Sequence, residues 1–283
     1  MLKLKEVEEC LYPHSIEEAA LMLQERDGRA RVVGGGLHLT VFPNPSIKTL
    51  VFLNNLNLNY VRETQSTIAI GATTTISSLA ESQPIITYLN KTVKNVLDSI
   101  ASELLRNQIT IGGSVAQREP YSDITTLLMA LNAEITLNDG NKDSQVNIND
   151  FYASRFREML STSIIKEIQL KKYDNSYKFG MNRYVRNATD IPLMNLAILS
   201  KIQNGILEEN RIIIGSRPGP SVEFTKGEEY LKSRALNDAL ADEFGAFTSQ
   251  NADVEGDVRV SREYRAKIAD VFSRNILKAF MEE

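Results

Sequence analysis

The stretch Arg106-Asn-Gln-Ile-Thr-Ile-Gly-Gly-Ser-Val-Ala-Gln-Arg-Glu-Pro-Tyr-Ser-Asp123 decides which fold the sequence predicts. A β-prone run at 109–111 leads into Gly112 and Gly113, and an apolar helix is expected after Asp123. Paired glycines at a strand end allow positive φ, and their bare N–H groups can converge on an anion. One such pair alone is more often a tight turn or a bulge.

A second glycine segment of the same kind lies earlier in the chain. It reads Val32-Val33-Gly34-Gly35-Gly36-Leu37-His38 and follows another short β-prone run. Two glycine segments at two strand ends suit a long diphosphate ligand that is held at two places.

Composition favours an ordinary globular protein with two domains, or one large domain with subdomains. The chain has 283 residues, of which 42% are hydrophobic and 24% charged. A formal net charge of −4 does not indicate the basic surface that binds nucleic acid. We therefore expect a phosphate-bearing ligand to be held by backbone amides and helix ends, not by a basic surface.

Cysteine and histidine are too scarce for most metal sites. Cys10 is the single cysteine, so an internal disulfide, a thiolate-ligated iron–sulfur cluster and a structural zinc site are not expected in this chain. His14 and His38 are the two histidines, which makes a histidine-rich metal site equally unexpected. No apolar run is long enough to span a bilayer and no signal peptide is visible, so we expect a cytoplasmic protein.

Local patterns predict a small parallel unit at the start of the chain. Ser15 followed by Glu18 is typical of a capping box, and Asp27-Gly28 would end that helix. Strands are expected at 31–33 and 49–53, and the strand–helix–strand order favours parallel pairing. The Asn-rich segment 54–59 is the expected boundary to the next subdomain.

The rest of the sequence predicts two further groups of strands and helices, one before and one after a polar linker. In the middle of the chain, strands are expected at 67–70, 134–137 and 163–170. Helices are expected from 75 to before Pro84, at 89–105 and at 124–131. A hairpin turn is expected at 138–141. After a polar linker at 171–176, strands are expected at 177–184, 195–202 and 211–214, with helices from 227 onward. The last part is thus a smaller α+β domain with a short antiparallel sheet.

Six motifs, in the same order, resemble the FAD-binding medium subunit of the molybdenum hydroxylase family, which includes xanthine dehydrogenase and carbon monoxide dehydrogenase. They are Tyr12-Pro13-x-Ser15 with Glu18-Ala19; Val33-Gly34-Gly35; Gly71-Ala72-Thr73; Arg106-Asn107 with Thr110-Ile111-Gly112-Gly113, Ala116, Pro120 and Asp123; Lys178-Phe179 with Asp190-Ile191; and Asp257-x-Arg259-x-Ser261 with Tyr264-Arg265. The similar stretches run nearly end to end.

This resemblance implies an α+β fold and a domain order. A two-subdomain FAD-binding domain of the vanillyl-alcohol-oxidase-like (PCMH) type would cover 1–53 and 55–172. A C-terminal α+β domain with a short antiparallel sheet and helices would cover 177–283.

The resemblance also implies an oxidoreductase subunit of the xanthine, aldehyde or CO dehydrogenase type. Electrons would pass from an iron–sulfur small subunit through non-covalent FAD to NAD or another acceptor. Substrate would be oxidised on a molybdopterin large subunit, and this chain would hold neither an iron–sulfur cluster nor molybdenum. No catalytic acid–base residue is expected, because the flavin supplies the chemistry.

Residues matching the family's motifs are the expected FAD site. They are Val33, Gly34, Gly35, Gly36, Leu37, His38, Thr110, Ile111, Gly112, Gly113, Ser114, Asp123, Ile165, Lys178 and Ile191. The glycines would donate backbone N–H groups to the pyrophosphate and the ribityl chain. Asp123 would accept from ribityl hydroxyls, or cap the helix at Ile124, or both.

The other assignments carry plain structural alternatives. Ile165 and Ile191 would contact the isoalloxazine ring or belong to ordinary core packing. Lys178 would place a positive charge near the reduced flavin or be a solvated surface charge. Arg106 and Asn107 are expected to be a helix C-cap pair.

Two departures from the family keep other functions open. Ser114 stands where the family usually has Asn, and Leu37 where it usually has Ser or Thr. Loss of these side-chain donors leaves open a non-catalytic assembly subunit with weakened FAD binding. A self-contained FAD oxidoreductase of the same fold, similar to the enolpyruvyl-UDP-sugar reductases, is a third possibility, against which Lys178-Phe179 and the segment 257–265 argue.

Overall fold

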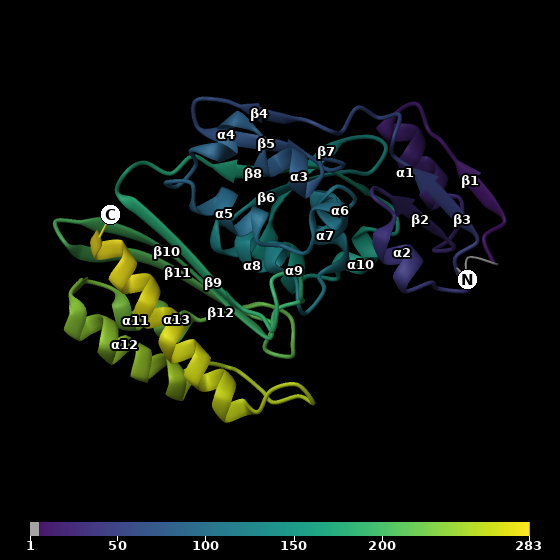
Figure 1. The fold of residues 1–283 in the computed structure, drawn as a ribbon. Helices are drawn as coiled ribbons and strands as arrows, with labels where there is room; N and C mark the ends of the chain where they lie inside the picture. The colour runs from purple at the N-terminus through teal and green to yellow at the C-terminus, as the bar shows by residue number, and fades with distance from the viewer. Residues whose placement is uncertain (1–5, 283) are drawn as a thin grey trace. The chain divides into compact units, whose positions relative to one another are not determined.

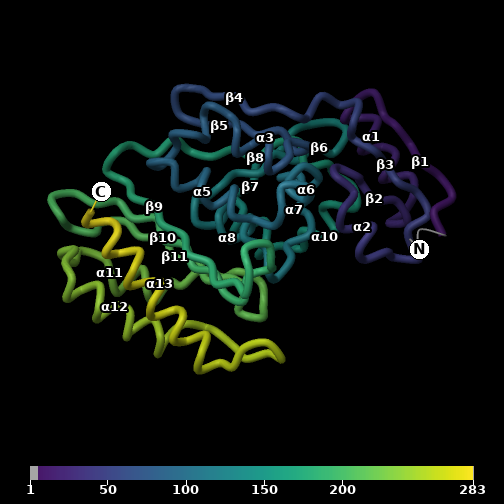
Figure 2. The backbone as a smooth tube through the Cα atoms, viewed as in Figure 1, coloured from purple at the N-terminus to yellow at the C-terminus, as the bar shows by residue number. Residues whose placement is uncertain are grey.

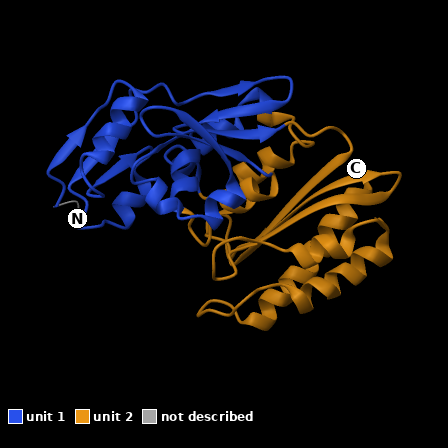
Figure 3. Cartoon of the chain, turned by 180° about the vertical axis from the view of Figure 1, so that it is seen from behind, with its two compact units in different colours: residues 1–84, 102–117, 132–171 blue, residues 85–101, 118–131, 172–283 orange. Residues whose placement is uncertain are grey.

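The computed structural model describes residues 6–282, which form two compact units (Figure 3). Unit 1 comprises residues 1–84, 102–117 and 132–171, and unit 2 comprises residues 85–101, 118–131 and 172–283. Helix α4 (Gln83–Ile86) lies where the chain first passes from one unit to the other.

Unit 1 begins with a three-stranded parallel sheet in the order β1-β3-β2 (Figure 1). Its elements are β1 (Glu9–Leu11), α1 (Ile16–Gln24), β2 (Ala30–Val33), α2 (Leu37–Val41) and β3 (Thr49–Phe52). Ser15 is the N-cap as predicted, and its Oγ accepts the N–H of Glu18 at 3.1 Å. The reciprocal bond of a capping box is shifted by one residue, because the Glu18 carboxylate accepts the N–H of His14 at 2.6 Å and not that of Ser15. Helix α1 buries Leu23 in a cluster that includes Val51 of β3 and Ile164.

The second sheet of unit 1 has five antiparallel strands in the order β4-β5-β8-β6-β7. The strands are β4 (Val61–Glu63), β5 (Thr67–Gly71), β6 (Glu134–Asn138), β7 (Asp143–Asn147) and β8 (Ile164–Lys171). The helices between them are α3 (Ile76–Ala80), α6 (Glu103–Arg106), α7 (Ile111–Gln117), α9 (Ile148–Ala153) and α10 (Phe156–Met159). The hairpin turn predicted at 138–141 joins β6 to β7.

Unit 2 is built on an antiparallel sheet in the order β12-β11-β10-β9, with β13 paired to β11. Its strands are β9 (Tyr177–Tyr184), β10 (Met194–Gln203), β11 (Ile206–Gly215), β12 (Val222–Glu223) and β13 (Arg234–Ala235). Its helices are α5 (Thr92–Asp98), α8 (Asp123–Ala130), α11 (Thr225–Leu231), α12 (Asp238–Asn251) and α13 (Arg262–Glu282). The three long strands run side by side along the backbone trace (Figure 2).

Alternation along β10 explains how helices cover both faces of this sheet. Met194, Leu196 and Ile198 point into the cluster formed with α12 and α13. Asn195 points the opposite way and bonds to side chains of α8. The α+β C-terminal part is therefore the sheet-and-helix structure that the sequence predicted.

Two local predictions are wrong. The helix expected at 89–105 is two helices, because Ala101 adopts a φ of 49° and Ser102 starts α6 as a new N-cap. The strand expected at 109–111 is only an isolated bridge from Thr110 to Thr75, and α7 begins at Ile111. Thr110 ends the extended segment because its hydroxyl accepts the N–H of Gly113 and caps the helix.

The predicted subdomain boundaries at 1–53, 55–172 and 177–283 stay a prediction, although each sheet falls within one of these ranges. In the described part of the chain, no helix has the length and apolar character that crossing a bilayer requires.

Candidate functional site

The first glycine segment connects β2 to α2 and presents unused backbone donors. Gly36 is the N-cap of α2 with a φ of 75°, a left-handed conformation that favours glycine. Among residues 6–282, no acceptor takes the N–H groups of Gly34, Gly35, Gly36 or Leu37. Unused N–H groups on one turn can bind an anion together.

The second glycine segment differs from the prediction. Gly112 and Gly113 lie in the first turn of α7 and do not have positive φ. The N–H of Gly112 donates to the carbonyl oxygen of Ala72 at 2.9 Å, and that of Gly113 donates to Thr110 Oγ1 at 3.2 Å. These two amides are thus engaged within the protein, and the unused donors belong to the first segment.

Close packing explains the glycines of both segments: Gly34 and Gly35 approach the residues before α7, and Gly112 approaches Ala72. A Cβ on Gly35 would lie 1.6 Å from the carbonyl oxygen of Gln108, and one on Gly34 would lie 2.7 Å from Thr110 Oγ1. A Cβ on Gly112 would meet the carbonyl oxygen of Ala72 at 2.8 Å. Glycine here allows the parallel sheet and the start of α7 to approach closely.

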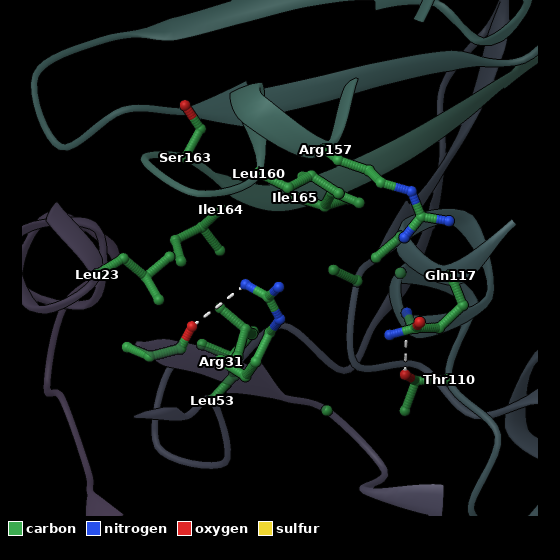
Figure 4. Close-up of a pocket in the computed structure, with 17 residues that line it drawn as sticks. Leu23, Arg31, Leu53, Thr110, Gln117, Arg157, Leu160, Ser163, Ile164 and Ile165 are labelled. Atoms are coloured by element: carbon green, nitrogen blue, oxygen red, sulfur yellow. Dashed lines mark hydrogen bonds between the residues drawn. The ribbon is translucent and has the colours of Figure 1, made fainter. Parts of the chain in front are cut away.

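A cavity of about 150 Å³ lies in unit 1 beside these segments (Figure 4). Its walls come from α1, β2, α7, α10 and β8, so it joins the parallel sheet to the antiparallel sheet. It is lined by Leu23, Ala30, Arg31, Val32, Gly34, Leu53, Ala72, Thr110, Gly112, Gly113, Ala116, Gln117, Arg157, Leu160, Ser163, Ile164 and Ile165. The structure therefore brings together five of the expected site residues: Gly34, Thr110, Gly112, Gly113 and Ile165.

The other expected residues of unit 1 lie around this cavity without lining it. Val33 and Ile111 are buried in the core. The ring of His38 packs against that of Phe42, with their centroids 5.2 Å apart. Ser114 Oγ donates back to the carbonyl oxygen of Thr110 at 3.0 Å, so this hydroxyl proton is directed into the helix.

Three expected residues belong to unit 2. Lys178 is half-buried on β9, and Ile191 is exposed, with its N–H donating to Asp190 Oδ1 at 2.9 Å. Asp123 is the first residue of α8, whose N-cap is Ser122, so the prediction of Asp123 as the cap is wrong. Arg106 and Asn107, in contrast, end α6 as predicted, with Asn107 as the C-cap.

Asp123 is held by a buried polar network within unit 2. Its Oδ1 accepts from Asn195 Nδ2 at 2.8 Å, and its Oδ2 accepts from Arg183 Nε at 3.1 Å. Burial raises the pKa of Asp123, while the charge of Arg183 opposes that shift. The carboxylate is fixed in one orientation, yet each oxygen retains a lone pair for a further donor.

Two arginines of the cavity, Arg31 and Arg157, were not among the expected site residues. A basic site was not expected, because the chain is acidic overall and these two residues are far apart in it. Alternation along β2 was the available signal, since Arg31 is an exposed residue between buried Ala30 and half-buried Val32. Nothing local marks Arg157.

Within residues 6–282, no group of three or more His, Cys, Asp or Glu side chains could hold a metal ion. Cys10 is a free, exposed cysteine.

Comparison with protein families identifies both parts of the chain. Residues 5–170 match the family model described as the FAD binding domain in molybdopterin dehydrogenase. Residues 181–280 match the model described as the CO dehydrogenase flavoprotein C-terminal domain.

Individual proteins agree with these matches along nearly the whole chain. The glyceraldehyde dehydrogenase medium chain of Sulfolobus acidocaldarius is 26% identical over 275 residues, which cover 95% of each chain. The carbon monoxide dehydrogenase medium chain of Hydrogenophaga pseudoflava is 24% identical over 278 residues, which cover 94% of each chain.

Solved structures show the same fold. Carbon monoxide dehydrogenase from Hydrogenophaga pseudoflava, in a form that lacks the Mo-pyranopterin moiety, gives a TM-score of 0.87 at 22% identity over 96% of both chains. Quinoline 2-oxidoreductase from Pseudomonas putida 86 gives 0.84 at 20% identity, again over 96% of both chains. The predicted α+β fold, with a PCMH-type FAD-binding domain and a C-terminal domain, is confirmed.

Proposed function

Because the chain belongs to the family of molybdopterin-dehydrogenase FAD subunits, we propose that it is the electron-transfer subunit of a multi-subunit dehydrogenase. It binds one FAD without a covalent bond, receives electrons from an iron–sulfur partner and delivers them to NAD or another acceptor. The observation that carries the proposal is the cavity of unit 1, where both glycine segments meet beside unused backbone N–H groups.

The residues of unit 1 fit a phosphate-bearing cofactor. The N–H groups of Gly34, Gly35, Gly36 and Leu37 supply donors for phosphate oxygens without a side chain in the way. Gly112 and Gly113 keep the wall of the cavity free of side-chain bulk, and Ile165 offers an apolar surface to a ring. When bound, FAD supplies hydride and one-electron transfer chemistry, so the chain needs no acid–base residue of its own.

Residues of unit 2 complete the proposal through their match to the family's motifs. Asp123, already fixed by Arg183 and Asn195, accepts hydrogen bonds from ribityl hydroxyls with its remaining lone pairs. Lys178 contributes a positive charge near the flavin ring, which favours the reduced anionic form, and Ile191 contributes an apolar contact.

The partners follow from the same family membership. The matching proteins are named as medium chains, and a medium chain implies a smaller and a larger chain beside it. We assign the iron–sulfur clusters to the small partner and the molybdopterin to the large partner, where substrate is oxidised. The substrate is therefore a property of another polypeptide.

One observation favours a second candidate, an assembly subunit with weakened FAD binding. Ser114 replaces the family's usual Asn, and its hydroxyl donates to the carbonyl oxygen of Thr110 at 3.0 Å. That hydroxyl proton is then not available to a ligand. The four unused N–H groups of the first segment argue for the flavoprotein instead, because they do not depend on this side chain.

The test is a pull-down of this chain from its native host, followed by flavin, iron and molybdenum analysis. We expect two further polypeptides, with FAD, iron and molybdenum in the purified assembly. We expect the isolated chain to lack hydroxylase activity on purines, aldehydes or CO. A lone monomer that turns over substrate without iron or molybdenum would contradict the subunit proposal. An intact assembly that lacks flavin would support the assembly subunit.

A further inference from the structure

A chain of buried hydrogen bonds in unit 2 runs from Ser221 to Asp123. Asn195 Nδ2 donates to Asp123 Oδ1 at 2.8 Å, and Thr126 Oγ1 donates to Asn195 Oδ1 at 2.8 Å. The Oγ1 atom of Thr126 and the Oγ atom of Ser221 are also 2.8 Å apart. None of these four residues is more than 4% exposed. Side chains from α8, from β10 and from the loop before β12 therefore form one buried network.

The carboxylate at the end of this chain fixes the direction of every proton in it. Asp123 is paired with a guanidinium group and has no proton to donate, so the amide of Asn195 turns its N–H groups toward Asp123 and its carbonyl oxygen toward Thr126. Thr126 gives its hydroxyl proton to that oxygen, because its other acceptor, the carbonyl oxygen of Ser122, lies 3.5 Å away. Ser221 must then donate to Thr126 Oγ1. Every hydrogen bond points toward the carboxylate.

This direction favours the ionised form of Asp123. Burial raises the pKa of Asp123, and Arg183 on β9 is the charged group that opposes that shift. The bond from Asn195 on β10 opposes it as well, because a donor to a carboxylate stabilises the charged form. Hydrogen bonds that point the same way strengthen one another, so the hydroxyl groups behind Asn195 support its bond to Asp123.

Close packing holds the hydroxyl groups of the chain together at Gly215, the last residue of β11. A Cβ on Gly215 would lie 2.2 Å from both Asn195 Oδ1 and Thr126 Oγ1, and 2.7 Å from Ser221 Oγ. The three oxygen atoms therefore converge at a point where a side chain would displace them. Thr125 Oγ1, on the preceding residue of α8, is also buried but has no hydrogen-bond partner among residues 6–282. Burial alone thus does not place a hydroxyl group in the network.

We propose that Thr126 and Ser221 are positioning residues, which act through Asn195 to keep Asp123 a group that only accepts hydrogen bonds. The inference rests on the proposed function, in which Asp123 binds the ribityl hydroxyls of FAD. It adds two residues that are too deeply buried to contact the cofactor themselves. A carboxylate that only accepts favours a ligand that donates, so the network selects a hydroxylated chain at this position.

The first measurement does not depend on flavin binding. The carboxyl carbon of Asp123 is followed by NMR during a pH titration of the full chain without flavin. Thr126→Val and Ser221→Ala should each raise the pKa of Asp123, because each weakens the bonds to its charged form. Thr126→Ser keeps the hydroxyl group and should restore the pKa of the unchanged protein. Thr125→Val is the matched control and should leave that pKa unchanged, since the hydroxyl that it removes has no partner among residues 6–282.

The second measurement is the FAD dissociation constant of the same variants, obtained from flavin fluorescence. Thr126→Val and Ser221→Ala should each weaken FAD binding by about two- to tenfold, the effect of losing one hydrogen bond. Thr126→Ser and Thr125→Val should bind FAD as the unchanged chain does. In a chain that also carries Asp123→Asn, Thr126→Val should cause no further loss, because the hydroxyl acts through the carboxylate. Thermal unfolding shows whether each variant keeps its fold, and Ser221→Ala provides the same test if Thr126→Val does not.

The outcomes distinguish this inference from the proposed function. If the chain does not bind FAD, yet Thr126→Val raises the pKa of Asp123 and Thr125→Val does not, the inference stands and the function is wrong. If the chain binds FAD, and Thr126→Val and Thr125→Val agree in both measurements, the function stands and the inference is wrong. An equal loss of FAD affinity from Thr126→Val with and without Asp123→Asn would also overturn the inference, because the hydroxyl would then act independently of the carboxylate.

Discussion

Gly35 is the residue at which the first glycine segment approaches the segment before α7 most closely. Its Cα faces the carbonyl oxygen of Gln108, and any side chain at this position would have to displace the segment before α7. The neighbouring Gly34 and Gly36 have N–H groups without an acceptor among residues 6–282. A single methyl group therefore tests the geometry without altering charge.

Gly35→Ala should weaken FAD binding by about tenfold to a hundredfold, since overpacking at a rigid contact costs about 1–3 kcal/mol. Gly205→Ala is the control: it has a φ of +74° and no atom near its Cβ, so it strains a hairpin turn of unit 2 without touching the cavity. We expect this control to lose some stability and no FAD affinity. The measurement is the FAD dissociation constant of each variant, and equal constants for Gly35→Ala and the unchanged chain would contradict the site.

Among single residues, the sequence predicted the glycines that line the cavity but not its two arginines. Gly34 and Gly112 stood out because two glycine segments each follow a β-prone run, and glycine allows close approach of the backbone. Arg31 has only the alternation along β2 as a local signal and Arg157 has none, and only the folded chain brings strand β2 and helix α10 to one cavity. The positive φ expected at Gly112 was wrong, because close packing against Ala72 requires glycine there instead.

Among the elements of unit 2, α8 is tied to the sheet by a buried ion pair. Arg183 Nε on β9 bonds to Asp123 on α8 at 3.1 Å, and its Nη1 and Nη2 donate to the carbonyl oxygens of Ser99 and Asp190, respectively. The side chains of Arg183 and Asp123 are only 13% and 3% exposed. Removing one partner would leave the other charge buried.

Arg183→Leu should therefore destabilise the protein by about 3–5 kcal/mol, the usual effect of breaking a buried pair. Arg186→Leu is the matched control, because Arg186 pairs with Asp190 at 2.6 Å but is 62% exposed, and solvent screens such a pair so that its loss should change stability little. Urea unfolding followed by circular dichroism gives both values. A similar small loss for the two variants would show that the buried network does not hold α8.

Glu228 on α11 makes the stability of the same unit depend on pH. Burial and the neighbouring Glu223 raise the pKa of Glu228 to about 7, while its bond from the N–H of Ile212 opposes the shift. Because the pKa of Glu228 is higher in the folded than in the unfolded state, the protonated carboxyl favours folding. This contribution of Glu228 to stability is complete below the unfolded pKa of 4.5 and is lost as pH rises through about 7.

The melting temperature should accordingly fall between about pH 5 and pH 8, and Glu228→Gln should reduce that fall. Glutamine keeps an oxygen to accept from Ile212 and removes the titration. Glu229→Gln, an exposed neighbour, should leave the pH profile unchanged. Parallel profiles for the Glu228→Gln variant and the unchanged chain would contradict the assignment.

Elements were predictable where one strong local pattern decided them. The strand at 177–184 and the turn at Asn204-Gly205 were predicted as observed, and the positive φ of both turn residues fits the Asn-Gly pair. The spacing of hydrophobic residues predicted one helix at 89–105. It did not predict that Ala101 adopts a left-handed backbone conformation, which separates α5 from α6. Ile109-Thr110-Ile111 has β-branched residues, yet the Thr110 hydroxyl starts a helix instead.

For the whole molecule, the order of motifs was more informative than any one of them. Six segments in one order pointed to the family, and the matches at 5–170 and 181–280 confirm it. The motifs did not predict which segments pack together. Residues 85–101 and 118–131 cluster with the C-terminal part of the chain in unit 2. Those segments carry Asp123 into unit 2, where contacts distant in sequence hold it.

The central claim is that this chain binds one FAD through the two glycine segments, and flavin titration tests it most directly. Flavin-free protein is titrated with FAD and, separately, with FMN, and the bound flavin is then released with acid and identified. We predict one FAD per chain, full release into the acid supernatant, and weaker binding by Gly35→Ala but not by Gly205→Ala. A preference for FMN, colour retained in the precipitate, or no flavin binding at all would contradict the account.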